Sequence, residues 1–223
     1  MDKIMDKIME VKNLVKMYKD TEDIYAADDV SVDINKGEFI LITGESGAGK
    51  STLLYIMGLM LKPDKGELMF GGKPLNWSNE DELNSYRRNK MGFVFQEPQL
   101  VEALTVNENL MLMKGLNNSE LEIDGLLEEF GLLKHKDKLP NTLSGGQKRR
   151  VMVLMAIVKK PEVIFLDEPT NDLDEKWSEK VLVKLKKLSN QGTSIVMVSH
   201  DEQCKKHADK VLCMKSGKID EIM

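Results

Sequence analysis

The stretch GESGAGKS, from Gly44 to Ser51, restricts the fold more than any other part of this 223-residue chain. It fits the pattern G-x-x-x-x-G-K-S, and the strand-like segment EFILIT comes directly before it. The helical pattern STLLYIMGLML follows, so we expect a helix that begins at Lys50 and ends before Pro63. A glycine loop between a strand and a helix lets backbone N–H groups wrap phosphates. The sequence therefore predicts an α/β fold around a phosphate-binding loop (P-loop).

Each part of this loop has an expected task. Lys50 would contact the β- and γ-phosphates of ATP, and Ser51 would hold Mg²⁺. A chance match in an unrelated loop is the alternative, and the flanking strand and helix argue against it. The residues expected to bind the nucleotide are Gly44, Glu45, Ser46, Gly47, Ala48, Gly49, Lys50, Ser51 and Thr52.

Polar residues also stand at the ends of three other predicted strands. VIFLD ends in Asp167 and is followed by Glu168, while Gln96 follows MGFVF and His200 follows SIVMVS. Open α/β sheets bind ligands at the carboxyl ends of their strands. We expect Asp167 in the Mg²⁺ shell and Glu168 as the general base for the attacking water. Gln96 would reach metal and water, and His200 would touch the γ-phosphate, although either alone could be a strand-end cap.

The remaining pattern predicts a single domain over residues 1–223, with a P-loop core and two additions. Alternating residues from Glu10 to Thr43 predict an antiparallel N-terminal subdomain, and residues 101–158 read as a helical lobe. Beyond that lobe strands and helices alternate, which favours a mostly parallel sheet. Residues 1–8 carry a small MDKI repeat and are expected to be a leader without a role.

Finer signals locate several elements. Capping boxes are expected at Thr105–Glu108 and Ser119–Glu122. Other elements are expected as a strand over residues 66–72, helices from about Asp81, from about Glu175 and near 202–208, and a final hairpin over 211–222.

Composition excludes several classes of function. The 32 Lys and Arg against 37 Asp and Glu give a net charge of -5, so nucleic acid is not an expected partner. Two cysteines are too few for a disulfide framework, which suits a reducing cytosol. Cys204 and His207 could form half of a metal site, but no second pair of ligands follows. No window approaches 18 apolar residues, so no membrane-spanning helix is expected.

The stretch LSGGQKRR, from Leu143 to Arg150, contains no acid, base, nucleophile or metal ligand. Its two adjacent glycines stand directly before the apolar run VMVLMAIV. Glycine costs roughly 1 kcal/mol per residue in a helix interior. The chain must therefore need bare backbone at this point.

Taken in order, GESGAGKST, FVFQ, LSGGQ, VIFLDEPT, NDLD and VSHD resemble the nucleotide-binding subunit of an ATP-binding cassette (ABC) transporter. The resemblance covers about Glu10 to Ile222. It implies an ATP-sandwich homodimer, in which the signature motif LSGGQ of one copy meets the γ-phosphate in the P-loop of the other. The signature residues involved would be Ser144, Gly145, Gly146 and Gln147, and Asp174 of the NDLD loop would also border the nucleotide. It also implies that Tyr18 stacks on adenine; an ordinary edge-strand tyrosine is the alternative.

The stretch GFVFQEPQLVEALTVNENL further resembles lipoprotein-releasing and macrolide-exporting transporters. It implies an ATPase that lies in the cytoplasm, peripheral on the inner face of the cell membrane. There it would power export or extraction through a separate permease, touched near residues 96–106 and the helical lobe. Met155 stands where the family usually has arginine, Asp172 where a small residue is typical, and the helical lobe looks shortened. These departures bear on coupling more than on ATP binding.

Two other functions stay open. A soluble ABC protein acting on DNA or the ribosome would resemble proteins with long coiled-coil insertions or two cassettes, and neither feature is present. An ATP-dependent regulator could instead signal to a cell-wall or division complex without transport. The intact Glu168 and His200 favour turnover over such a role.

Overall fold

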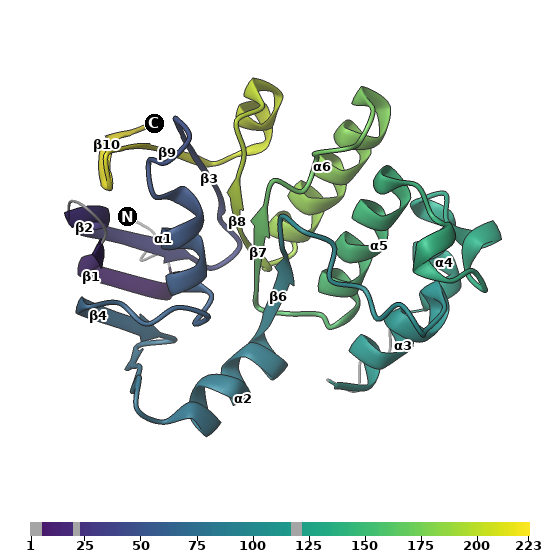
Figure 1. Cartoon of the computed structure of the whole chain (residues 1–223), viewed down its shortest axis with the longest axis horizontal. Coiled ribbons are helices and arrows are strands. Elements are labelled where there is room, and N and C mark those ends of the chain that lie inside the picture. Colours follow the sequence, from purple (N-terminus) through teal and green to yellow (C-terminus); the bar gives the residue numbers. More distant parts are fainter. Residues whose placement is uncertain (1–5, 20–22, 117–121) are drawn as a thin grey trace.

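The computed structural model describes residues 6–19, 23–116 and 122–223, and it contains two sheets with helices around them (Figure 1). The larger sheet has the strand order β10-β9-β3-β8-β7-β6. Its strands are β3 (Phe39–Gly44), β6 (Met91–Val94), β7 (Val163–Asp167), β8 (Ser194–Val198), β9 (Lys210–Lys215) and β10 (Lys218–Ile222). All neighbours pair in parallel except the β9–β10 hairpin. The predicted α/β fold with a mostly parallel sheet is confirmed.

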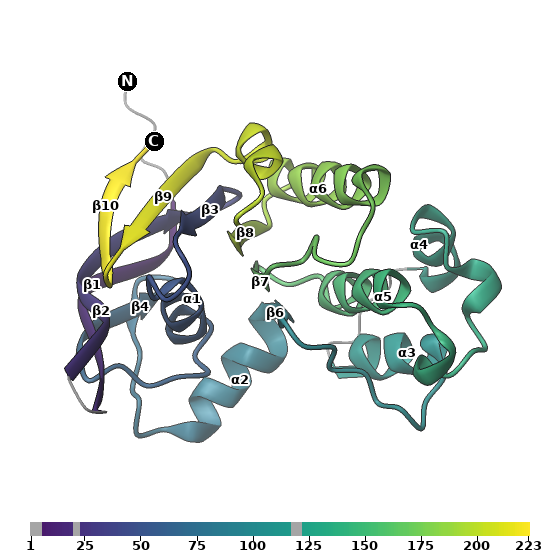
Figure 2. The ribbon, with the colours of Figure 1, turned by 45° about the horizontal axis from the view of Figure 1, so that its top comes forward.

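The smaller sheet is antiparallel and has the order β2-β1-β4-β5. Its strands are β1 (Lys7–Lys19), β2 (Asp23–Asn35), β4 (Lys65–Phe70) and β5 (Lys73–Pro74). Helix α1 (Lys50–Met57) packs beside it (Figure 2), and Leu53, Ile56 and Met57 share one apolar core with residues of both sheets. This packing fixes the P-loop, which lies between β3 and α1.

The other helices are α2 (Glu80–Lys90), α3 (Val106–Leu116), α4 (Ile123–Glu129), α5 (Gly145–Val158) and α6 (Glu175–Asn190). Helices α3, α4 and α5 lie together on the side away from the antiparallel sheet (Figure 2). Every residue of α5 from Arg149 to Val158 is buried. Strands β7 and β8 are also buried at every position, as expected for central parallel strands with helices on both faces.

Two predictions about element ends are wrong, and one helix is of another type than expected. Helix α1 ends at Met57 rather than near Pro63, because Gly58 ends it and Leu59 takes a left-handed φ of 60°. The helix predicted near residues 202–208 is present as a 3₁₀ helix, Glu202–His207. The proposed leader is also too long, because Lys7 and Ile8 belong to β1 and Ile8 is buried.

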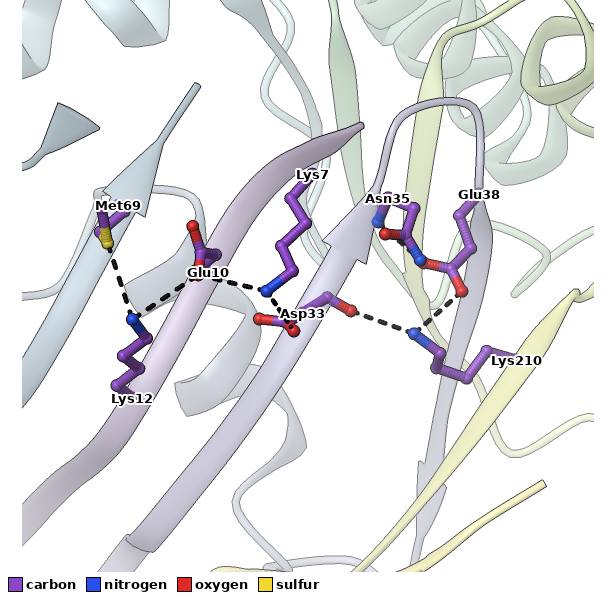
Figure 3. Close-up of polar contacts among 8 residues, drawn as sticks. All are labelled: Lys7, Glu10, Lys12, Asp33, Asn35, Glu38, Met69 and Lys210. Carbon is purple, nitrogen blue, oxygen red and sulfur yellow. Dashed lines mark hydrogen bonds and ion pairs between the residues drawn. The ribbon is translucent and has the colours of Figure 1, made fainter. Parts of the chain in front are cut away.

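The start of β1 is held by ion pairs as well as by the strand ladder. Lys7 lies between Glu10 and Asp33, at 3.3 and 2.8 Å (Figure 3). On the other side of Asp33, Lys210 donates to the Asp33 carbonyl at 3.0 Å and pairs with Glu38 at 2.9 Å. These contacts join the two sheets at a point far from the P-loop end of β3.

One of the two predicted capping boxes lies within the described residues. The box at Thr105 is confirmed: Glu108 accepts from the Thr105 backbone N–H, and its own N–H donates to Thr105 Oγ1. Ser119 lies outside the described residues.

Candidate functional site

The P-loop has the geometry of a phosphate cradle. Gly49 has a φ of 98°, and a Cβ there would come within 1.8 Å of the Ala26 carbonyl oxygen, so only glycine fits. Lys50 Nζ donates to the carbonyl oxygens of Gly44 and Glu45, at 2.8 Å each. The ammonium group is therefore held inside the loop, next to the N-terminus of α1, where anions bind well.

The acidic end of β7 faces this loop. Ser51 Oγ donates to Asp167 Oδ1 at 3.2 Å, and Asp167 is 1% exposed. Asp167 Oδ2 and Glu168 Oε2 are buried and have no hydrogen-bond partner among the described residues. Buried carboxylate oxygens are rarely left unpaired, so they suit a ligand, an ion or water.

These residues fit Mg²⁺. A hydroxyl and one carboxylate are hard oxygen donors, and Mg²⁺ typically binds through one or two carboxylates, phosphates and water. The described residues contain no group of three or more His, Cys, Asp or Glu side chains that could hold a metal.

Glu168 also contacts His200, which lies two residues after the end of β8. His200 Nδ1 lies 2.9 Å from Glu168 Oε1 and shares a hydrogen bond with it. This hydrogen bond and the negative charge of Glu168 raise the pKa of His200. Glu168 itself has a left-handed φ of 49°, an unusual conformation that turns it out of line with β7.

An open hollow of about 610 Å³, which we call the nucleotide hollow, brings these groups together. It is lined by most of the predicted P-loop residues and by all four predicted strand-end residues. Ala48 is buried beneath the loop and does not line it. The predicted members are Gly44, Glu45, Ser46, Gly47, Gly49, Lys50, Ser51, Thr52, Gln96, Asp167, Glu168 and His200.

The signature motif borders a separate hollow. Ser144 caps α5, and its side chain and that of Gln147 form a reciprocal capping box. This signature hollow is lined by Ser144, Gly145, Gly146, Arg150, Asp172, Leu173, Asp174 and Trp177. It shares no residue with the nucleotide hollow. The structure therefore places the predicted nucleotide-binding residues in two groups.

Besides Ala48, two predicted residues line neither hollow. Tyr18 is 44% exposed at the end of β1, where it pairs with Ile24 of β2. Gln147 uses its side-chain oxygen to accept from the Ser144 N–H, at 2.9 Å. Its amide nitrogen lies 3.2 Å from His135 Nε2, so this side chain stabilises the start of α5.

Among the residues at the nucleotide site that sequence reasoning missed, two are polar. Asn171 lines the nucleotide hollow, and its backbone N–H donates to the Glu168 carbonyl. Tyr55 lies near Asp167, and burial together with that carboxylate raises the pKa of Tyr55 to about 12. Its position four residues after Ser51, on the same helix face, was the available signal.

The strand, glycine loop and helix, with an acid-terminated strand beside them, define a P-loop nucleoside triphosphatase. The sequence pattern of the family described as ABC transporter matches residues 27–171. The chain belongs to the ABC transporter family and is an ATPase of that family.

Curated relatives agree with this assignment. The chain is 39% identical to the lipoprotein-releasing system ATP-binding protein LolD of Aquifex aeolicus, over 96% of this chain and 97% of that protein. It is 38% identical to the macrolide export ATP-binding/permease protein MacB of Chlorobaculum tepidum, over 95% of this chain. The chain spans only 33% of the length of that MacB protein.

A solved structure agrees as well. The ATP-binding cassette MJ0796 of Methanocaldococcus jannaschii, a dimer in a post-hydrolysis state bound to ADP and Pi, has a TM-score of 0.89 and 35% identity. The match covers 96% of this chain and 97% of that chain. In the part of the chain described here, no helix is long and apolar enough to cross a membrane.

Proposed function

We propose that this chain is the ATP-hydrolysing subunit of a transporter, that two copies sandwich ATP, and that a separate permease is its partner in the membrane. The proposal places it in the cytoplasm, peripheral on the inner face of the cell membrane. The names of the LolD and MacB relatives support export or extraction from the membrane.

The separation of the two hollows carries the dimer proposal. Gly145 and Gly146 present bare backbone at the N-terminus of α5, but no P-loop residue of the same chain lines that hollow. A helix N-terminus without a side chain in the way favours an anion such as phosphate. A second copy, placed head to tail, would supply the phosphate from its own P-loop. The MJ0796 cassette, a dimer bound to ADP and Pi, supports self-association of this chain.

In this proposal each residue of the nucleotide hollow has one task. Lys50 and the P-loop N–H groups hold the phosphates, while Ser51, Gln96 and Asp167 hold Mg²⁺, which neutralises charge on the phosphate oxygens when bound. Glu168 accepts a proton from the attacking water, and His200 positions Glu168 and the γ-phosphate. Tyr18 would stack on adenine at the edge of the site.

A third hollow, of about 440 Å³, supports the permease part of the proposal. It lies among α2, β6, α3 and α5, and we call it the apolar groove. Its lining combines methionine and phenylalanine side chains with three cations and no acid: Met60, Asn84, Arg87, Arg88, Phe93, Phe95, Gln99, Met113, Met152, Met155, Ala156 and Lys159. Met155, which departs from the family pattern, forms part of the apolar wall. A permease segment with apolar and acidic side chains would fit it.

Replacing Glu168 with Gln tests the ATPase and dimer proposals together. The change keeps size and removes the base, so hydrolysis should fall by about 10² or more. ATP should then persist and hold two copies together, which gel filtration with Mg²⁺ would detect. A Glu168→Gln protein that binds ATP but stays monomeric at all ATP concentrations would contradict the sandwich.

A further inference from the structure

Arg149 makes a set of contacts that neither the P-loop nor the signature motif accounts for. It lies on α5 two residues after Gln147, the last residue of the signature motif, and it is only 4% exposed. Its guanidinium donates to the carbonyl oxygens of Phe95, at 2.9 Å, and Gln96, at 2.7 Å. The same group lies 3.5 Å from the carboxylate of Asp172.

These three contacts lie at three different hollows. Phe95 lines the apolar groove, Gln96 lines the nucleotide hollow, and Asp172 lines the signature hollow. The backbone carbonyls of Phe95 and Gln96 belong to the point where β6 leaves the sheet. One rigid group therefore fixes the backbone that carries Gln96 and also contacts the loop that borders the signature motif.

The chemistry of arginine suits this arrangement. Its planar group presents several N–H donors in fixed directions, which an ammonium group does not. Burial of the charge is costly, and Arg149 Nε has no partner among the described residues. Two carbonyls and one distant carboxylate offset that cost only in part, which argues for a role other than stability.

Among the three contacts of Arg149, the contact with Asp172 is the one that a second copy could change. Its φ is 64°, its side chain is 61% exposed, and its carbonyl oxygen lies where a Cβ on Gly146 would come within 2.7 Å. The Asp172 backbone therefore packs against the signature glycines, while its carboxylate remains accessible to a second copy. A phosphate brought to the signature hollow would act on this carboxylate directly, because like charges repel at short range.

We propose that Arg149 is a positioning residue that sets Gln96 in the nucleotide hollow according to the position of the Asp172 loop. Closure of the dimer at the signature hollow would move Asp172, change its ion pair with Arg149 and so shift Gln96 of the same copy. The inference rests on the proposed roles of Gln96 and of the shared site.

A double-mutant cycle on the full-length chain tests this role, with kcat and KM for MgATP as the readout. Asp172→Asn keeps shape and tolerates the left-handed φ, and Arg149→Gln removes the fork of donors. Each should lower kcat by about ten-fold or more while monomer binding of ATP is kept, as for other orienting residues around a metal site. The double variant should be no slower than Arg149→Gln alone, because both changes break one connection.

Lys210→Gln is a matched control for the loss of a semi-buried cation. Lys210 also holds one backbone carbonyl and one carboxylate, but at the far end of β3 (Figure 3). This variant should lose thermal stability and keep kcat. Equal kcat losses for Lys210→Gln and Asp172→Asn, or single effects of Arg149 and Asp172 that multiply in the double variant, would overturn the inference.

Gln96→Ala separates the inference from the function on which it rests. If Gln96→Ala lowers kcat and the exposed Asp172→Asn does not, the inference fails and the role of Gln96 stands. If Gln96→Ala leaves kcat unchanged, the proposed role of Gln96 fails and the inference falls with it. If Arg149→Gln does not fold, the kcat of Asp172→Asn tests the inference by itself.

Discussion

At the residue scale, the sequence predicted which polar residues stand at the strand ends, because each one follows an apolar strand pattern: Gln96, Asp167, Glu168 and His200. The sequence did not predict that Glu168 and His200 pair with each other. The hydrogen bond between Glu168 and His200 depends on the left-handed φ of Glu168 and on β7 and β8 being neighbours in the sheet. Neither feature has a local sequence signal, because both are set by packing between distant segments.

The Glu168–His200 contact predicts that His200 has a higher pKa than His135. Glu168 raises the pKa of His200 above 6.5, whereas burial lowers that of His135. A raised pKa means that the contact stabilises the fold fully below about pH 6.5 and is lost as pH rises through the higher value. NMR titration should show His200 as the later to deprotonate, and Glu168→Gln should move its pKa back down. An unchanged His200 pKa in that variant would contradict the pairing.

Tyr18 gives a second prediction at this scale. If its exposed ring stacks on adenine, Tyr18→Ala should weaken ATP binding by roughly 1 to 3 kcal/mol, by analogy with base stacking on aromatic side chains. Isothermal titration with a non-hydrolysed ATP analogue measures this. Unchanged affinity in a folded variant would leave Tyr18 as an ordinary residue of the β1 edge.

At the element scale, the order of strands and helices could be predicted, but some ends could not. The apolar pattern after the P-loop continues through Leu59 because that residue is buried in the core. A buried turn and a buried helix have similar apolar patterns, so the pattern alone did not show where α1 ends. The signature helix shows the opposite case. Ser144 and Gln147, three residues apart, are a local capping signal, and the box forms.

Lys159, at the C-terminal end of α5, predicts a pH effect on stability. Its ammonium donates to the carbonyls of Arg87 and Met91, and burial lowers its pKa to about 8. The unfolded chain binds this proton up to about pH 10.5, so stability should rise with pH between these values. Relative to Lys159→Met, the unfolding free energy should gain up to about 3 kcal/mol over that window. Urea unfolding at several pH values would show it, and a constant difference would contradict the lowered pKa.

At the scale of the whole molecule, two of the three hollows are lined by residues of α5, and Arg149 of the same helix donates to the Gln96 carbonyl at the edge of the third. The nucleotide hollow contains P-loop residues, the signature hollow is at the start of α5, and the apolar groove contains Met152 and Met155 from the middle of the helix. The family resemblance implied that the signature motif and the P-loop of one copy serve different sites, and the structure adds that they line two hollows with no residue in common.

If the permease binds in the apolar groove, a charge placed in the groove should abolish that binding. Met155→Glu places a carboxylate in its apolar wall, so an apolar and acidic permease segment should no longer bind. Co-purification from membranes with the permease would measure this, and Val183→Glu, an exposed change on α6, serves as the control. Equal retention of the permease by both variants would exclude the groove as the docking site.

The shared site is the central claim, and mixing two inactive variants tests it most directly. Gly145→Asp suits this better than a change at Gly146, because a Cβ there stays at least 3.5 Å from Asp172, and aspartate is favourable in the first turn of a helix. Its charge at about 4 Å from a phosphate, with an effective dielectric near 20, costs on the order of 4 kcal/mol. Lys50→Ala removes phosphate binding in the other half of the site.

Each variant alone should be inactive, and the Gly145→Asp monomer should still bind ATP. In a mixed dimer both changes fall in one site, and the other site has an intact P-loop and an intact signature motif. We therefore predict that mixing Lys50→Ala and Gly145→Asp restores part of the ATPase activity. A mixture no more active than its components, with heterodimers present, would contradict the claim, as would loss of ATP binding by the folded Gly145→Asp monomer.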